Sequence, residues 1–306
     1  MAELVARPGL LGQRARIARK RRNWTPDLLA APALVAMLLV MGFPLLYLLY
    51  MSFHRWSLIS FTPPHFNGVE NFTALASDDR FIASLWRTLY FTALGLASNL
   101  PAGLGIALLL DQRFPTRNLL RALLILPMVA TPAAMGLVWV VMLDPSLGIV
   151  RYVFRLLGVI SPPLWLSSPA WVVPTLVMVD AWMWTPMVAL VCMAGLAALP
   201  LEPFEAARVD GASAWQRFRF ITFPLLAPTL LIATMLRVMD LLKVIDIVYV
   251  MTGGGPGHES ETINLYNYLV ALSYDRIGYG AAVALVLFVL VMLCTLALIR
   301  LRRASL

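Results

Sequence analysis

The sequence predicts an all-α polytopic membrane protein with six transmembrane helices. Its 306 residues are 60% hydrophobic and only 13% charged, and their mean hydropathy is +0.81. Soluble domains carry about 25% charged residues. One soluble core of this size could not bury so much apolar surface, so the composition fits a chain whose solvent is a lipid bilayer.

Six apolar stretches are long enough to be the spans, since a transmembrane helix needs roughly 20 mostly apolar residues. They cover residues 28–53, 85–110, 119–143, 171–197, 225–250 and 280–299. Several contain proline, which a helix in a bundle tolerates because neighbouring helices satisfy the freed carbonyls. We therefore expect six transmembrane helices.

The basic N-terminus, residues 1–27, precedes the first apolar stretch as the charged region of a signal peptide does. The apolar run that follows is too long for a signal peptide, and no small-residue cleavage site comes after it. We expect a retained first span, with residues 28–306 forming the membrane domain.

Lysine and arginine are distributed unequally between the predicted loops. If the N-terminus is cytoplasmic, the inner segments hold 16 of these residues and the outer segments hold six. Such a bias predicts that both termini lie in the cytoplasm.

Several classes of function are disfavoured. The net charge is +8, but the basic residues gather at the ends of apolar runs and do not form a nucleic-acid-binding face. Cys192 and Cys294 lie within apolar stretches and lack metal-ligand spacing. The sequence has no Walker motif and no pair of nucleophile and base. We therefore expect neither a cofactor nor catalysis in this chain.

The predicted cytoplasmic loop 200–224 contains a short helix with clear boundaries. Pro203 suits a first helical turn, and Gly211 suits the left-handed conformation that ends a helix. A second helical stretch, residues 214–221, carries an apolar face that we expect to lie against the membrane surface.

The residues of this loop resemble a known motif. Glu205-Ala206-Ala207, three residues, Gly211, nine residues, Ile221, two residues and Pro224 resemble the EAA loop of ABC importer permeases, with Phe223 in place of the usual leucine. Residues 246–257 resemble the end of span five in carbohydrate permeases of the maltose-permease type, and residues 66–72 also fit this family.

The resemblance implies a type I ABC importer permease fold in the inner membrane of a bacterium. It implies a second permease as heterodimer partner, a substrate-binding protein, and two cytoplasmic ATPase subunits that bind ATP and Mg. In the family the EAA loop forms the coupling helix that docks on the ATPase. The residues that match this docking site, called the joint below, are Glu205, Ala206, Ala207, Asp210 and Gly211.

The same resemblance implies a substrate site on spans four and five. The matching positions are Asp180, Trp184, Met187, Arg237, Asp240, Leu241 and Val244. An aromatic face with a carboxylate suits a hydroxyl-rich neutral solute, so we expect a sugar or polyol. A phosphorylated polyol is the weaker alternative, because one arginine with carboxylates nearby makes a poor phosphate clamp.

Other interpretations of these charges stay open. Arg237–Asp240 and Lys243–Asp246 are opposite charges three residues apart, so each pair could neutralise itself along the helix instead of contacting substrate. A carrier driven by an ion gradient could use Asp180 for its coupling ion, but the loop 200–224 would then lack a purpose. A membrane-embedded enzyme would need a catalytic constellation. The sequence does not select the sugar, nor decide whether the site lies in this chain or its partner permease.

Overall fold

The computed structural model describes residues 25–59, 62–112, 114–159 and 161–304, and most of them are helical. The described chain divides into two units at the bond between Tyr47 and Leu48. The all-α prediction is confirmed. Of the predicted basic N-terminus, residues 1–24 lie outside the described residues.

The first unit is one apolar helix. It contains α1 (Thr25–Met37), a π-helical turn η1 (Leu38–Gly42) and the first residues of α2 (Phe43–Ser52). Residues Leu29–Ser52 are long and apolar enough to qualify as a membrane span. This agrees with the predicted span 28–53.

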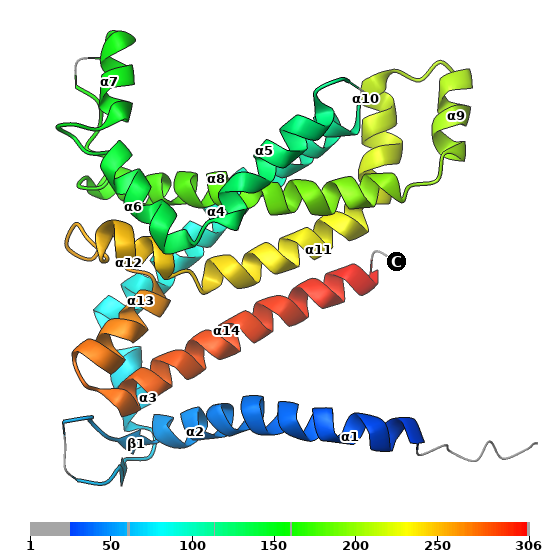
Figure 1. Ribbon diagram of the computed structural model, residues 1–306. Helices are drawn as coiled ribbons and strands as arrows, with labels where there is room; N and C mark the ends of the chain where they lie inside the picture. The colour runs from blue at the N-terminus through cyan, green and yellow to red at the C-terminus, as the bar shows by residue number, and fades with distance from the viewer. Residues whose placement is uncertain (1–24, 60–61, 113, 160, 305–306) are drawn as a thin grey trace, which may run out of the picture. The chain divides into compact units, whose positions relative to one another are not determined.

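The second unit begins with the last residues of α2. A short antiparallel hairpin of β1 (His54–Arg55) and β2 (His65–Phe66) follows, and then α3 (Glu70–Ala76). Its long helices lie alongside one another (Figure 1) and are α4 (Asp79–Asp111), α8 (Pro169–Ala197), α11 (Phe223–Leu242) and α14 (Ile277–Ala304). The shorter elements are α5 (Arg117–Val129), α6 (Pro132–Met142), α7 (Ile149–Leu156), α9 (Glu202–Val209), α10 (Ala214–Arg217), η2 (Phe218–Thr222), α12 (Asp246–Thr252), α13 (Ile263–Tyr268) and η3 (Leu269–Ser273).

The third predicted span, over 119–143, is not one straight helix. The chain forms α5 and α6, which meet at an angle of 97°. Ala130 and Thr131 between them are extended, with ψ of 151° and 137°. The ring of Pro132 disfavours a helical conformation in the residue before it, which explains the break.

The fifth span is shifted from its predicted position at 225–250. One helix runs through α10, η2 and α11, from Ala214 to Leu242, and α12 is a separate helix. The stretch 214–221 is therefore not a separate surface helix. Pro224 would clash with the carbonyl four residues earlier in a regular α-helix, and the wider π turn η2 directly before it lets the helix continue. Pro44 follows η1 in the same way.

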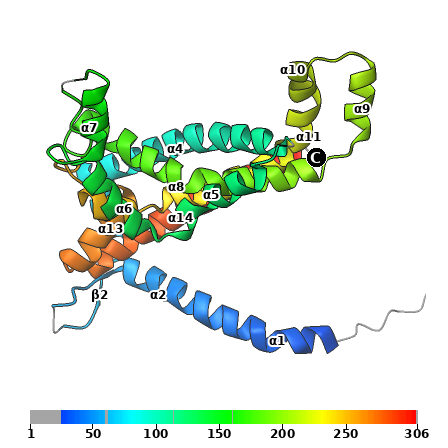
Figure 2. The same ribbon diagram turned by 45° about the horizontal axis from the view of Figure 1, so that its top comes forward.

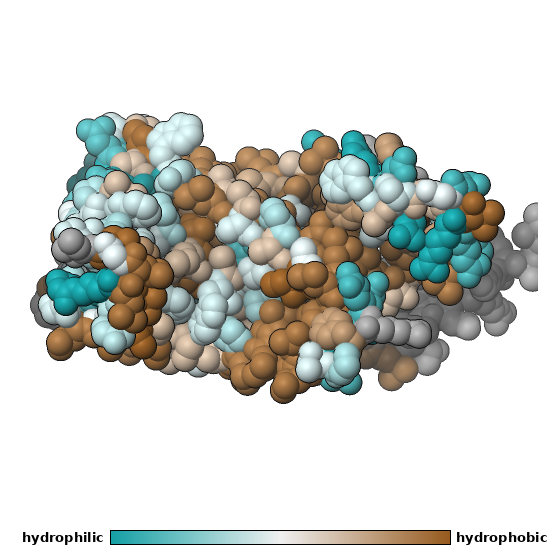
Figure 3. Space-filling model, turned by 90° about the horizontal axis from the view of Figure 1, so that it is seen from above, coloured by the Kyte–Doolittle hydropathy of each residue, from teal (hydrophilic) through white to brown (hydrophobic). Residues whose placement is uncertain are grey.

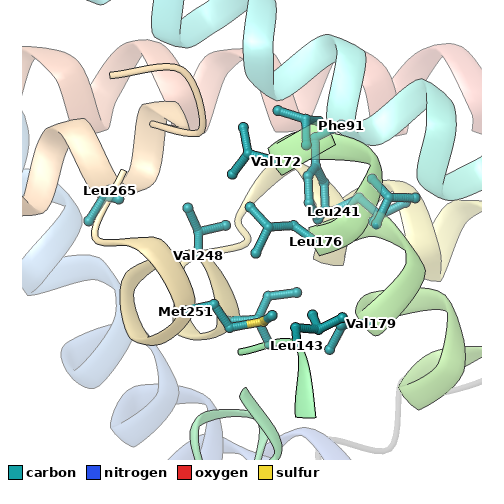
Figure 4. Close-up of a cluster of buried hydrophobic side chains, with 12 residues drawn as sticks. Phe91, Leu143, Val172, Leu176, Val179, Leu241, Val248, Met251 and Leu265 are labelled. Atoms are coloured by element: carbon teal, nitrogen blue, oxygen red, sulfur yellow. The ribbon is translucent and has the colours of Figure 1, made fainter. Parts of the chain in front are cut away.

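The largest apolar cluster joins α4, α8, α11, α12 and α13 (Figure 4). Phe91, Leu176, Leu241, Val248 and Leu265 are among its buried members. It lies at the end of the long helices where α12 and α13 are found (Figure 1).

Small side chains let α4 approach α8 and α11 closely. Gly95, Asn99, Gly103 and Ala107 recur at every fourth position of α4, and all four are buried. A Cβ atom on Gly103 would lie 2.6 Å from the Cβ of Val188 on α8. Small residues at this spacing are typical of helix contacts in membranes.

The two ends of the second unit differ in content. Helix α9 and the end of α14 lie at one end, and α7, α12 and α13 lie at the other, in both ribbon views (Figures 1 and 2). On the face in Figure 3, hydrophilic side chains gather toward these ends and hydrophobic ones between them. The distribution is that of helices crossing a bilayer.

Candidate functional site

Helix α9 lies in the connection between α8 and α10, where the sequence predicts a helix. Pro203 occupies its first turn, as predicted. Gly211 follows with φ of +73°, a conformation that side-chain-bearing residues rarely adopt. The N–H of Gly211 donates to the carbonyl of Arg208, and the N–H of Ala212 to that of Ala207. These bonds satisfy the free carbonyls at the helix end.

The surface of α9 is open. Glu205, Ala206, Asp210 and Gly211 are exposed and Ala207 is half-buried, so the five predicted joint residues lie together on an accessible turn and helix. None of the residues of α9 is buried. The helix therefore contributes nothing to the buried core, and its surface is accessible.

A hollow of about 550 Å³ lies beside α9, where α9, α10 and the end of α4 come together. Phe204 and Arg208 of α9 line it with Trp215, Arg217 and Phe218 of the following helix. The hollow combines two guanidinium groups with aromatic rings on the face next to the predicted joint.

A buried polar cluster ties the three long helices α4, α8 and α11 together. The guanidinium of Arg237 donates to the carboxylate of Asp180. Asn99 Nδ2 donates to the same carboxylate over 3.3 Å, and Thr185 Oγ1 donates to Asn99 Oδ1 over 3.2 Å. All four side chains are buried. Inside a membrane protein such charges persist because they are paired and hydrogen-bonded.

Arg237 has capacity for further contacts. Its Nε and Nη1 atoms are buried without a hydrogen-bond partner among the described residues. Its guanidinium carbon lies 5.7 Å from the ring centroid of Trp184, within range of a cation–π contact. Asp240 reaches to 4.0 Å from Nη1, and its side chain is 46% exposed.

The structure divides the seven predicted substrate residues by accessibility. Asp180, Arg237 and Leu241 are buried, and Leu241 lies in the apolar cluster against Gly95. The four that reach the surface at least in part are Trp184, Met187, Asp240 and Val244. Contact of these residues with substrate stays a prediction.

The two charge pairs inferred from spacing behave differently. Asp180 is the close partner of Arg237, and Asp240 is the distant one. Lys243 lies in the break between α11 and α12, and no ion pair joins it to Asp246 in the described part of the chain.

Sequence reasoning missed Asn99 and Thr185. Asn99 is a polar residue inside an apolar stretch, on the four-residue stripe of α4, and that position was the available signal. No comparable signal marks Thr185, because single threonines are common within spans.

A second missed cluster lies at the opposite end from α9. Asp78 caps α4 by accepting the N–H groups of Arg80 and Phe81, and the hydroxyls of Tyr266 and Tyr279 donate to its other oxygen over 2.5 and 2.7 Å. Burial alone would raise the pKa of Asp78, but these hydrogen bonds, led by those from the tyrosines, hold it below its ordinary value of 3.8.

Arg80 adds a bidentate pair to this cluster. Its Nε and Nη2 donate to Glu261 over 2.9 and 2.7 Å, and the Glu261 side chain is buried. The pair joins the start of α4 to the loop before α13. No group of three or more His, Cys, Asp or Glu residues suited to a metal ion is found in the described ranges.

Comparisons with known proteins give one family. A family model described as "binding-protein-dependent transport system inner membrane component" matches residues 99–304. The sulfoquinovosyl glycerol transport system permease protein SmoG of Agrobacterium fabrum is 36% identical over 278 residues, which are 91% of this chain and 90% of SmoG. The trehalose/maltose transport system permease protein MalF of Thermococcus litoralis is 35% identical over 279 residues, 90% of this chain and 92% of MalF.

A solved structure shares the fold. The crystal structure of a bacterial ABC transporter that imports the acidic polysaccharide alginate contains a chain that matches with a TM-score of 0.80 and 22% identity. The match covers 92% of the present chain and 96% of the other.

Proposed function

We propose that this chain, which belongs to the family of binding-protein-dependent transport system inner membrane components, is a permease subunit of an ATP-driven ABC importer. In this proposal it forms the translocation pathway for a sugar or polyol. A permease subunit of this family is not an enzyme, since ATP hydrolysis occurs in its partners. In this proposal two ATPase subunits bind ATP and Mg on the cytoplasmic side. A substrate-binding protein delivers the solute on the other side, and a second permease completes the pathway.

One observation carries the proposal. Helix α9 has defined boundaries and the residues of the EAA motif, yet it buries no residue against its own chain. It is connected directly to α8 on one side and through α10 to α11 on the other. A displacement imposed on α9 by an ATPase would therefore act on both helices that carry the predicted substrate residues.

The ion pair supports movement of α8 and α11 as one body. Asp180 and Arg237 join these helices inside the protein, and Asn99 attaches α4. Rigid-body rocking of packed helices about a central site is a common way to achieve alternating access. The buried cluster makes these three helices suited to such a movement.

The predicted neutral solute is consistent with the charges. Asp180 compensates the charge of Arg237, which leaves the exposed Asp240 and the ring of Trp184 as candidates to meet a hydroxyl-rich ligand. The two relatives above, which cover most of the chain, are transport permeases for sulfoquinovosyl glycerol and for trehalose or maltose. We take a sugar or polyol as the substrate class of this chain.

Transport by the reconstituted complex tests the proposal. The chain is purified with its co-purifying subunits, placed in proteoliposomes with the binding protein, and supplied with labelled sugars, polyols and their phosphate esters. We expect uptake of a neutral sugar or polyol that requires ATP. Uptake by the chain alone without ATP, or tight and selective binding of a phosphate ester, contradicts the proposal.

The proposal includes an orientation with α9 and both termini in the cytoplasm. Single cysteines at Ala206 and at Glu259 report on opposite ends of the second unit, and a membrane-impermeant thiol reagent added outside intact cells should label only the latter. Labelling of Ala206→Cys from outside contradicts this orientation.

A further inference from the structure

Helix α7 has two apolar faces, of which the chain covers only one. Val150 and Phe154 lie on the covered face: Val150 packs on the largest apolar cluster, and the ring of Phe154 lies 5.5 Å from that of Trp165. The other face is open and consists of Ile149, Tyr152, Val153, Leu156 and Leu157. Leu156 and Leu157 are 69% and 74% exposed.

The remaining narrow strip of α7 is basic. At 100° per residue, Arg151 and Arg155 lie close together in azimuth and beside the open apolar face. Arg155 is exposed, and Arg151 donates to the carbonyl of Pro145. The segment 144–168 has one acidic residue, Asp144, whose carboxylate accepts the N–H groups of Ser146 and Leu147 over 2.7 and 2.8 Å.

The direction of α7 differs from that of the spans. It runs across the line of α8 in both ribbon views, at the end of the molecule opposite α9 (Figures 1 and 2). Helix α6 precedes it and α8 follows it, so both of its neighbours are membrane-associated segments. Helix α7 therefore connects the ends of two segments that are apolar enough to cross a membrane.

We propose that α7 is an interfacial helix that binds the membrane surface on the side opposite α9, with its open apolar face among the acyl chains and its arginines on anionic phospholipid headgroups. A helix with a broad apolar face bounded by arginine has the composition of interfacial helices. The crosswise direction places its whole length at one depth. The basic strip complements anionic lipid and leaves one acidic group, already hydrogen-bonded, in the segment.

Accessibility of spin labels tests the depth of α7. In the importer complex in nanodiscs, Cys192 and Cys294 are replaced by alanine, and single labels are attached at Tyr152→Cys and Leu156→Cys. We expect both labels to be relaxed more by oxygen, which enters lipid, than by a water-soluble nickel chelate. A label at Glu259→Cys, an exposed site at the same end of the molecule, should show the reverse order. If the α7 labels favour the nickel chelate, or if neither reagent reaches them because protein covers the face, the proposal is overturned.

Binding of spin-labelled lipid tests the role of charge. We expect the complex to prefer phosphatidylglycerol over phosphatidylcholine, and Arg155→Gln to reduce that preference by about fivefold, the effect of one cationic side chain at a membrane surface. Arg155→Lys retains the charge and should retain the preference. If Arg155→Gln binds the same fraction of both lipids as the parent protein, its preference for phosphatidylglycerol is unchanged. That result contradicts the assignment of Arg155 to anionic headgroups.

Discussion

Asp180 of α8 and Arg237 of α11 form an ion pair inside the protein, with side chains that are 4% and 0% exposed. Asn99 of α4 donates to the same carboxylate, so one acidic group holds three helices. Breaking a buried pair by neutralising one member leaves the other charge uncompensated, which costs about 3–5 kcal/mol.

Neutralising Asp180 should therefore destabilise the permease strongly. We expect Asp180→Asn to lower the free energy of unfolding by about 3–5 kcal/mol, measured by denaturant titration of the purified complex. The double variant Asp180→Asn/Arg237→Met should recover part of this loss because no unpaired charge remains. Asp246→Asn serves as the control, since Asp246 is exposed. Equal stability of Asp180→Asn and the parent would show that the pair does not hold the helices together.

Two glycines of α4 should respond oppositely to the same substitution. Gly103 faces Val188 so closely that a Cβ would overlap with it, whereas nothing lies within 4 Å of a Cβ on Gly105. We expect Gly103→Ala to cost about 1–3 kcal/mol through overpacking. Gly105→Ala should be neutral or stabilising by up to about 1 kcal/mol, because alanine is the better helix former. Thermal unfolding of the two variants in one detergent provides the measurement. A similar loss in both would contradict the close contact of α4 with α8.

Local sequence signals were sufficient to predict most of the helices, including α9. The six apolar stretches follow from composition, and the ends of α9 follow from Pro203 and Gly211, whose backbone preferences act within a few residues. The break before Pro132 was missed because proline is tolerated inside membrane helices, so its presence alone does not separate a kink from a bend of 97°.

Contacts between distant segments could not be predicted in the same way. Spacing suggested Asp240 as the partner of Arg237, but the close partner lies 57 residues away on another helix. The period of a helix also leaves open which face meets lipid and which meets protein. Leu241, a substrate position implied by the resemblance alone, is buried in the apolar cluster.

The acid dependence of stability should report on the cap of α4. The pKa of Asp78 is lowered in the folded protein, since hydrogen bonds from Tyr266, Tyr279 and two N–H groups outweigh the effect of burial. A lowered pKa means that the ionised carboxylate stabilises the fold above its ordinary pKa of 3.8, and that this stabilisation is lost as the pH falls through the folded-state value.

We expect the difference in melting temperature between the parent and Asp78→Asn to be constant between about pH 5 and pH 8 and to shrink as the pH falls below about 4. Asp79→Asn is a matched control, because its exposed neighbouring carboxylate is not part of the cap. A difference that grows toward low pH would assign Asp78 the opposite sign of coupling.

The last prediction concerns the exposed joint. Glu205 lies on α9 with no buried neighbour in its own helix, so its replacement should leave the fold intact while changing what the helix can bind. If α9 docks on an ATPase, Glu205→Lys places the opposite charge in that contact, and we expect ATP-dependent uptake to fall by at least about tenfold. The melting temperature of the variant should match that of the parent.

Glu202→Lys makes the same charge change on the same helix outside the matching motif and should have a smaller effect on uptake. Loss of uptake together with retained ATPase association would mean that the joint fails in coupling, and loss of association would mean that it fails in docking. Full uptake by Glu205→Lys would contradict the assignment of α9 as the joint.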